Sequence, residues 1–164
     1  MAGKGKDQRK SATVLGGADY RNGAAERLED ARVLLDEGRF AGGIYMAGRA
    51  VEAILRPVIW TRDPEIRQGR KSLETGHDLR DLLALVANLG LLTARRSDDE
   101  FKDRVARVSQ RWFNNMRFAS SRVVETRWVR LTIVRRGMTL KQAAEQYFDD
   151  CSEILKRCEK LWQP

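Results

Sequence analysis

Apolar side chains recur at intervals of three and four residues through most of this chain, and this spacing limits the folds it can adopt. In an α-helix such residues share one face, because 3.6 residues complete a turn. Only three prolines interrupt the 164 residues, so long helices can form. The pattern predicts one all-α domain, an up-and-down bundle of four to five amphipathic helices.

The first two helices are predicted to form an antiparallel hairpin. One is expected over residues 22–37 and the next over 40–60, since Gly38 ends the first and leaves a short connection. Pro57 is expected to kink the second helix or nearly to end it. Close packing against the backbone is predicted at three glycines of this helix, Gly42, Gly43 and Gly48.

The rest of the chain predicts a loop and three more helices. Residues 61–76 lack an apolar face, which indicates a surface loop, and a third helix is expected over 77–89. A fourth helix begins at a capping-box pattern of Ser97 and Glu100, and a fifth begins at a similar pattern of Thr139 and Gln142. The buried stripe of the fourth helix is predicted to be Phe101, Val105, Val108, Trp112 and Met116.

Residues 119–138 fit two structures. Val129, Leu131 and Ile133 alternate as in a strand, whereas Val124, Trp128 and Leu131 have the spacing of a helix. The sequence is compatible with both.

The N-terminal part of the chain differs in composition from the remainder. Residues 1–20 are rich in glycine, lysine and small polar groups, which predicts a disordered basic tail ahead of a bundle over 21–164. The sequence has no apolar run of membrane-spanning length and no apolar leader, so we expect a cytoplasmic protein.

Neither a disulfide nor a bound metal or cofactor is expected. Cys151 and Cys158 lie seven apart on one predicted helix, about 10 Å from each other and beyond disulfide reach. They are predicted to be small buried side chains. One histidine and two cysteines make no recognisable set of metal ligands.

Positive charge is concentrated in one segment of a chain whose formal net charge is +8. Residues 117–136 hold six arginines against a single acid, Glu125. Arginine pairs with phosphate and stacks on bases, so this composition predicts a surface for RNA, a nucleotide or an acidic protein. The predicted anion-binding residues are Asn115, Arg117, Arg122, Arg127, Trp128, Arg130, Arg135 and Arg136.

A second polar group lies on the predicted second helix. Tyr45, Arg49, Glu52 and Arg56 recur at helical spacing. They form either a set of ion pairs or one wall of a groove that faces Arg117. His77 opens the third helix beside Asp78, where a capping role is weighed against a catalytic one.

Three local patterns together resemble the HEPN family of small helical bundles. The hairpin AAERLEDARVLLDEGRFAGGIYMAGRAVEAILRPVI is similar to the family's opening, with its Ala-x-x-Ala-x-Glu-like run at Ala47, Ala50 and Glu52. TGHDLRDLL resembles the entry to the third helix, and FNNMRF resembles an Arg-Tyr at the end of the fourth, with Phe118 in place of tyrosine.

The resemblance implies one of two kinds of activity. Some members are metal-independent ribonucleases of toxin–antitoxin or defence systems, and others are non-catalytic partners of a nucleotidyltransferase-like protein; both kinds often form homodimers. The ribonucleases carry an arginine followed after four to six residues by histidine, but Arg122, Val123 and Val124 occupy those positions after Arg117.

Histidine suits metal-free RNA cleavage because its pKa lies near neutrality. The sequence therefore favours a non-catalytic module that binds RNA, a nucleotide or a partner. Two alternatives remain: a ribonuclease that uses Arg117, Arg122 and His77, and a module that binds only proteins.

Overall fold

The computed structural model describes residues 15–68, 70, 79–88 and 96–162, and this part of the chain is all-α with no strand. The predicted helical bundle is confirmed. Its elements are α2 (Gly17–Asp36), α3 (Phe40–Arg62), α4 (Pro64–Arg67), α5 (Leu79–Asn88), α6 (Arg96–Arg111), the 3₁₀ helix η1 (Asn114–Phe118), α7 (Ser121–Arg130) and α8 (Leu140–Leu161).

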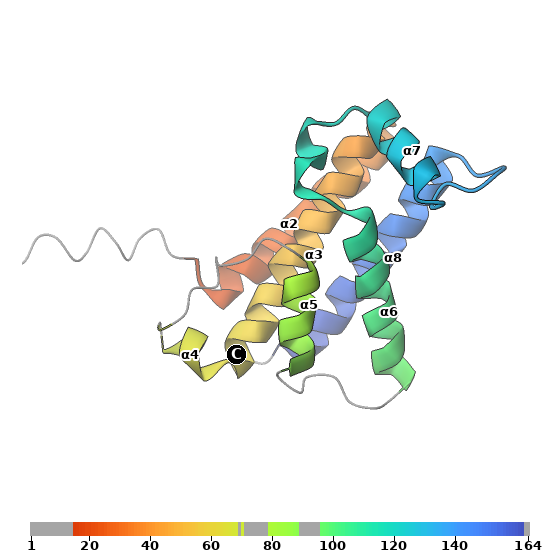
Figure 1. Cartoon of the computed structure of the whole chain (residues 1–164). Helices are drawn as coiled ribbons and strands as arrows, with labels where there is room; N and C mark the ends of the chain where they lie inside the picture. Colours follow the sequence, from red (N-terminus) through yellow and green to blue (C-terminus); the bar gives the residue numbers. More distant parts are fainter. Residues whose placement is uncertain (1–14, 69, 71–78, 89–95, 163–164) are drawn as a thin grey trace, which may run out of the picture.

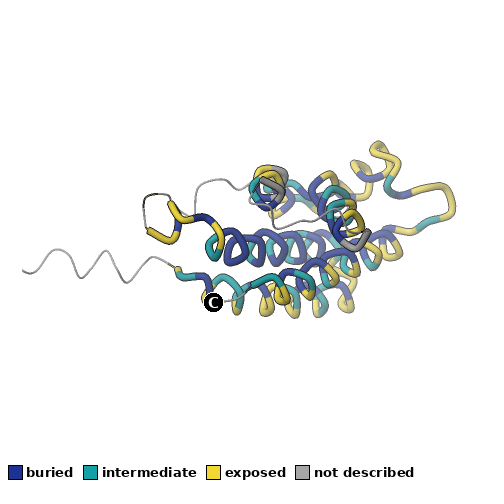
Figure 2. The backbone as a smooth tube through the Cα atoms, turned by 90° about the horizontal axis from the view of Figure 1, so that it is seen from below, coloured by how far each residue is buried: buried dark blue, intermediate teal, exposed yellow. Residues whose placement is uncertain are grey.

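Helix α3 is the centre of the bundle. Helix α2 packs antiparallel against it, and α5 and α8 contact it from other sides (Figure 1). Figure 2 shows the backbone of α3 buried along most of its length, whereas α2 exposes one face. This difference follows from sequence, because α3 carries apolar residues on nearly every side and α2 only on one.

Two glycines of α3 explain how its neighbours approach so closely. A Cβ on Gly43 would lie 2.6 Å from a methyl carbon of Leu35, and one on Gly48 would overlap the ring of Trp112. Both positions therefore need glycine for lack of space, and the predicted close packing is confirmed there. At Gly42 a Cβ would meet only the flexible end of Leu34, at 3.3 Å.

The α6 stripe is buried as predicted, but the helix itself is shorter than the stripe. Helix α6 ends at Arg111, Phe113 is extended, and Met116 belongs to η1. The indole of Trp112 stacks on Tyr45 and donates to the Tyr45 carbonyl oxygen at 3.2 Å. We attribute the helix end to this contact, because it holds Trp112 against α3 while the chain turns away.

Within the segment 119–138, residues 121–130 form helix α7 and the remainder is turns and irregular structure. In α7, Ser120 caps the N-terminus by accepting from the amide of Val123, and Val124 and Trp128 are fully buried. Val129 and Leu131 are exposed, so the strand alternative is wrong. Burial of residues four apart on one side of α7 favours the helix.

Several helices begin at residues other than those predicted. Helix α2 begins at Gly17, so residues 17–20 of the predicted tail are helical, and residues 1–14 lie outside the described part. The reason is a local cap, in which the Gly16 amide donates to the Asp19 carboxylate at 2.8 Å. Helix α6 begins at Arg96, one residue before the predicted cap Ser97.

Pro57 does not end α3, which continues to Arg62. The predicted loop 61–76 is partly helical, because Asp63 caps α4 and accepts from the Glu65 amide at 2.9 Å. Ile66 of α4 is buried, a contact that a search for a continuous apolar face misses. Residues 71–78 lie outside the described part.

The C-terminal helix matches its prediction most closely. Thr139 and Gln142 form the capping box at the start of α8, and both cysteines are free and buried. None of the described helices is long and apolar enough to cross a membrane.

Candidate functional site

Six exposed arginines gather at one end of the bundle. Helix α7 and its flanking segments lie across the end at which α2 finishes and α3 starts (Figure 1). We call this set the arginine-rich end; it consists of Arg117, Arg122, Arg127, Arg130, Arg135 and Arg136.

None of these six side chains forms an ion pair within the described part of the chain. Arginines on the sides of the bundle behave differently. Arg32, for example, binds Glu145 at 2.8 Å, and Arg157 binds Asp98. An unpaired guanidinium keeps its N–H donors free, so the arginine-rich end carries positive charge that no carboxylate of the described chain neutralises.

Two of these arginines lie over aromatic rings. The guanidinium of Arg127 lies 4.0 Å from the ring centre of Phe113, and that of Arg117 lies 4.7 Å from Phe118. These contacts orient the guanidiniums without neutralising them. Phe118 is 77% exposed, which leaves its ring accessible to a planar ligand.

Trp128 does not belong to this surface, and its predicted role as a base-stacking residue is wrong. Its side chain is fully buried, its ring lies 5.7 Å from that of Tyr147, and its Nε1 donates to the Arg111 carbonyl oxygen. The helical spacing of Trp128 with Val124 is the signal that placed it in the core. Asn115, another predicted contact residue, is exposed.

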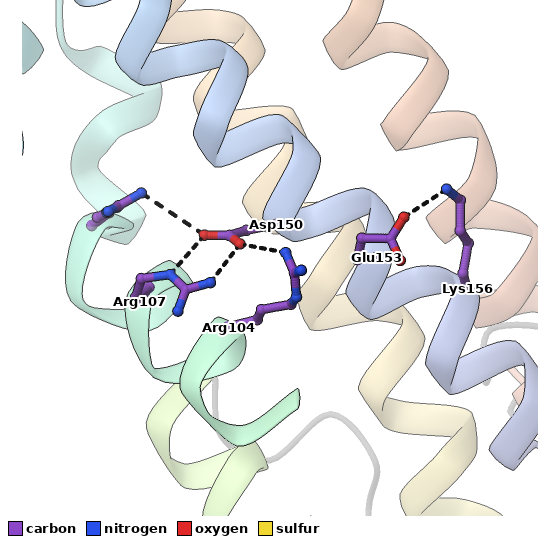
Figure 3. Close-up of polar contacts among 6 residues, drawn as sticks. Arg104, Arg107, Asp150, Glu153 and Lys156 are labelled. Carbon is purple, nitrogen blue, oxygen red and sulfur yellow. Dashed lines mark hydrogen bonds and ion pairs between the residues drawn. The ribbon is translucent and has the colours of Figure 1, made fainter. Parts of the chain in front are cut away.

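A second cationic cluster, which sequence analysis missed, surrounds one carboxylate between α6 and α8. Arg107 binds Asp150 through two hydrogen bonds, of 2.7 and 3.0 Å, and Arg104 donates to the same carboxylate at 2.8 Å (Figure 3). Arg111 lies 3.9 Å from it. Asp150 is nearly buried, at 6% exposure, so the Asp150 cluster holds three cations around one anion.

The three arginines differ in how well the carboxylate compensates them. Hydrogen bonding to Asp150 raises the pKa of Arg107 above its ordinary value. Burial lowers the pKa of Arg111. Its contact with Asp150 is too long for a hydrogen bond, so the carboxylate does not offset the effect of burial. The spacing of arginines at 104, 107 and 111 on one helix face is the sequence signal that could have found the cluster.

A pocket opens beside this cluster. It has a volume of about 780 Å³ and lies between α6, the segment after α7 and α8. We call it the Arg111 pocket; its lining residues include Arg107, Gln110, Arg111, Ile133, Arg135 and Gln146. Its Arg135 also belongs to the arginine-rich end, so the two features are continuous.

The predicted polar stripe of α3 divides into two parts. Glu52 is buried and binds Arg56 at 2.6 Å inside the bundle, and it also binds Arg49, whose side chain is partly exposed. Tyr45 instead lines a groove with Arg39 and Arg117. The structure thus brings Tyr45 and Arg117 together, and the groove is not lined by the other three.

The residues named for catalysis do not assemble into a described site. Arg117 and Arg122 are exposed on either side of the turn into α7, and His77 lies outside the described residues. Within residues 15–68, 70, 79–88 and 96–162, no group of three or more histidine, cysteine or acidic residues is placed to hold a metal.

Comparison of the chain with family models, with curated proteins and with solved structures found no match.

Proposed function

We propose that this protein binds single-stranded RNA through the arginine-rich end without cleaving it. The observation that carries the proposal is the set of six exposed arginines without a carboxylate partner in the described chain. A phosphate backbone supplies the missing counter-charges, and its condensed cations are released on binding.

The surface has features that suit an unpaired strand. Phe118 offers an exposed ring on which a base can stack, beside Arg117. Arg117 and Arg39 also line the groove that contains Tyr45, which has a volume of about 590 Å³. A strand crossing the arginine-rich end meets both charge and a ring, which is the combination typical of sequence-tolerant binding.

Fluorescence anisotropy with a labelled single-stranded RNA tests this proposal. Reversal of three charges in Arg122→Glu, Arg127→Glu and Arg130→Glu is expected to weaken binding by about 100-fold or more at low salt. The matched control is Arg62→Glu, Arg67→Glu and Arg70→Glu, which changes net charge equally near α4, at the opposite end of the bundle (Figure 1). Equal losses in both variants would reduce the effect to net charge and sink the proposal.

The same samples, kept in EDTA and run on a gel, test the ribonuclease alternative. Cleavage that disappears on Arg117→Ala or His77→Ala would replace our proposal with a metal-independent nuclease. We expect intact RNA, because a guanidinium offers only N–H donors and so supplies no general base for the 2′-hydroxyl proton.

An acidic partner protein is the second candidate, and exposed apolar residues favour it. Val123, Val129 and Leu131 are each about half exposed and lie among the arginines of α7. A partner that buries them while pairing the arginines would compete with RNA. If the protein binds such a partner and has no measurable affinity for RNA at low salt, the protein-binding alternative is established.

The family resemblance and its consequences rest on the three sequence motifs. Membership of the HEPN family, a nucleotidyltransferase-like partner, a toxin–antitoxin or defence role and a homodimer remain proposals. A homodimer formed through α7 would bring like charges together, which costs several kcal/mol. We therefore expect any dimer to use another face.

A further inference from the structure

The Arg111 pocket has an uneven distribution of charge. Arg107, Arg111 and Arg135 line it beside no acidic lining residue, and within the described part of the chain Asp150 is the ion-pair partner of the first two. Asp150 already accepts hydrogen bonds from Arg104 and Arg107, at 2.7 to 3.0 Å, so both of its oxygens are engaged. One carboxylate thus faces the guanidiniums of Arg104, Arg107 and Arg111, and Arg135 adds a further positive charge.

Arg111 is the cation that this arrangement compensates least. Its side chain is 18% exposed and its contact with Asp150 is 3.9 Å long. Burial without a close partner lowers its pKa, which means that a nearby anion would stabilise the charged form. The neighbouring cation Arg107 is held in place by its two hydrogen bonds to Asp150. Helix α6, which carries both arginines, is packed against α8, so Arg107 and Arg111 cannot separate easily.

The remaining lining residues are apolar or neutral. Leu131, Ile133 and Met138 form one wall, and the side chains of Gln110 and Gln146 lie along the pocket. The glutamine amides carry both a donor and an acceptor and can pair with the edge of a nucleobase, which carries both as well. The thioether of Met138 and the branched side chains of Leu131 and Ile133 can pack against a flat ring. The volume of about 780 Å³ falls within the range of small-ligand sites.

We propose that the Arg111 pocket binds a nucleotide phosphomonoester, with the phosphate between Arg107, Arg111 and Arg135 and the base against the wall formed by Ile133 and Met138. The ligand's phosphate supplies the charge that the cluster lacks, and guanidiniums bind phosphate oxygens in pairs. Two sources carry this chemistry, a free mononucleotide and the 5′-phosphorylated end of an RNA. The second source rests on the RNA binding proposed above.

Calorimetric titration with adenosine 5′-monophosphate tests the pocket directly, using the full chain. Adenosine and inorganic phosphate, titrated separately, are expected to bind at least about 10-fold more weakly, because each satisfies only one part of the pocket. If the mononucleotide binds no more tightly than phosphate, the base contacts do not exist and the proposal is wrong.

Two adjacent arginines provide a matched pair of variants. Both are exposed and neither forms an ion pair in the described structure, but only Arg135 lines the pocket. Arg135→Gln is expected to weaken the mononucleotide about 10-fold or more, and Arg136→Gln less than about 2-fold. Equal effects would reduce the binding to general electrostatics. Arg111→Lys, which keeps the charge but loses the planar fork, is expected to weaken binding as well.

RNAs with and without a 5′-phosphate separate the two sources. If the phosphorylated RNA binds more tightly and Arg135→Gln abolishes this preference, the pocket binds an RNA end. If the two RNAs bind with equal affinity while the mononucleotide binds tightly, the pocket binds a free nucleotide. RNA binding without mononucleotide binding overturns the pocket and leaves the proposed function intact. Mononucleotide binding without affinity for 5′-hydroxyl RNA overturns the proposed function and supports the pocket.

Discussion

The indole Nε1 of Trp128 donates a hydrogen bond of 3.2 Å to the carbonyl oxygen of Arg111. This contact joins α7 to the last residue of α6, and it buries the tryptophan that sequence analysis had assigned to the surface. It also sets where the arginines of α7 lie relative to the Arg111 pocket, because the segment after α7 forms one wall of that pocket.

We expect Trp128→Phe to lower stability without affecting RNA affinity. The phenyl ring keeps most of the packing against Tyr147, while the loss of the hydrogen bond and of indole volume lowers the free energy of unfolding by about 1 to 3 kcal/mol. Urea unfolding measures the first effect and anisotropy the second. A folded variant with RNA affinity lost would mean that Trp128 contacts the ligand after all.

Trp112 should be among the most sensitive core positions. It is 7% exposed and fills the space above Gly48, so Trp112→Ala is expected to cost about 3 to 5 kcal/mol in the free energy of unfolding. Gly48→Ala is expected to destabilise the same contact from the other side, because the added Cβ overlaps the ring. A double variant that is less destabilised than the sum would confirm the contact, and strict additivity would contradict it.

Removing the Asp150 charge should destabilise the protein in an anion-dependent way. Asp150→Asn leaves Arg104, Arg107 and Arg111 facing one another, and we expect a loss of about 1 to 3 kcal/mol, moderated because Arg104 and Arg107 are 36% and 42% exposed. Sulfate should restore more stability than chloride at equal ionic strength.

The control for this prediction lies on the same helix. Glu153→Gln breaks the exposed ion pair with Lys156, also drawn in Figure 3, and leaves the hydrogen bonds to Asp150 in place, so it is expected to cost less than about 0.5 kcal/mol. Equal effects of the two variants, or no advantage of sulfate, would mean that the Asp150 cluster is not a site of accumulated charge.

Stability is expected to decline in alkali because both cysteines are buried. Burial raises the pKa of the Cys151 and Cys158 thiols, so the folded protein keeps both protonated while the unfolded chain ionises them near the ordinary value of 9.0. Stability is therefore complete below that value and is lost as the pH rises above it, by up to about 1.4 kcal/mol per pH unit for each thiol.

Urea unfolding between neutral pH and about pH 10 measures this decline, since the thiols begin to ionise in the unfolded chain within that range. Cys158→Ala should show a shallower decline than the parent protein, by the share of one thiol. An identical pH dependence in both proteins would show that Cys158 ionises equally in the folded and unfolded states.

The helices were predictable because their evidence is local. The spacing of buried residues in α8 and the capping box of Thr139 and Gln142 both lie within one element, and both are present in the structure. The end of α6 was not predictable in this way. Trp112 continues the helical spacing, yet it packs on Tyr45, a residue 67 positions away in the chain.

In the candidate site too, local features were predictable from sequence and contacts between distant residues were not. Six arginines against one acid in residues 117–136 predicted the arginine-rich end, because charge density is visible in sequence. The Asp150 cluster joins residues 43 and 46 positions apart, so only the packing of α6 on α8 brings them together. Trp128 was misassigned because composition alone does not distinguish a tryptophan that stacks on bases from one that anchors a helix.

The salt dependence of RNA binding tests the central claim most directly. For single strands the slope of log K against log salt is about −0.7 for each phosphate neutralised, so Arg122→Gln, Arg127→Gln and Arg130→Gln together should make the slope shallower by about 2. The equally charged control Arg62→Gln, Arg67→Gln and Arg70→Gln should keep the parent slope. A parent protein without a salt-dependent affinity, or the same change of slope in both variants, would contradict binding through the arginine-rich end.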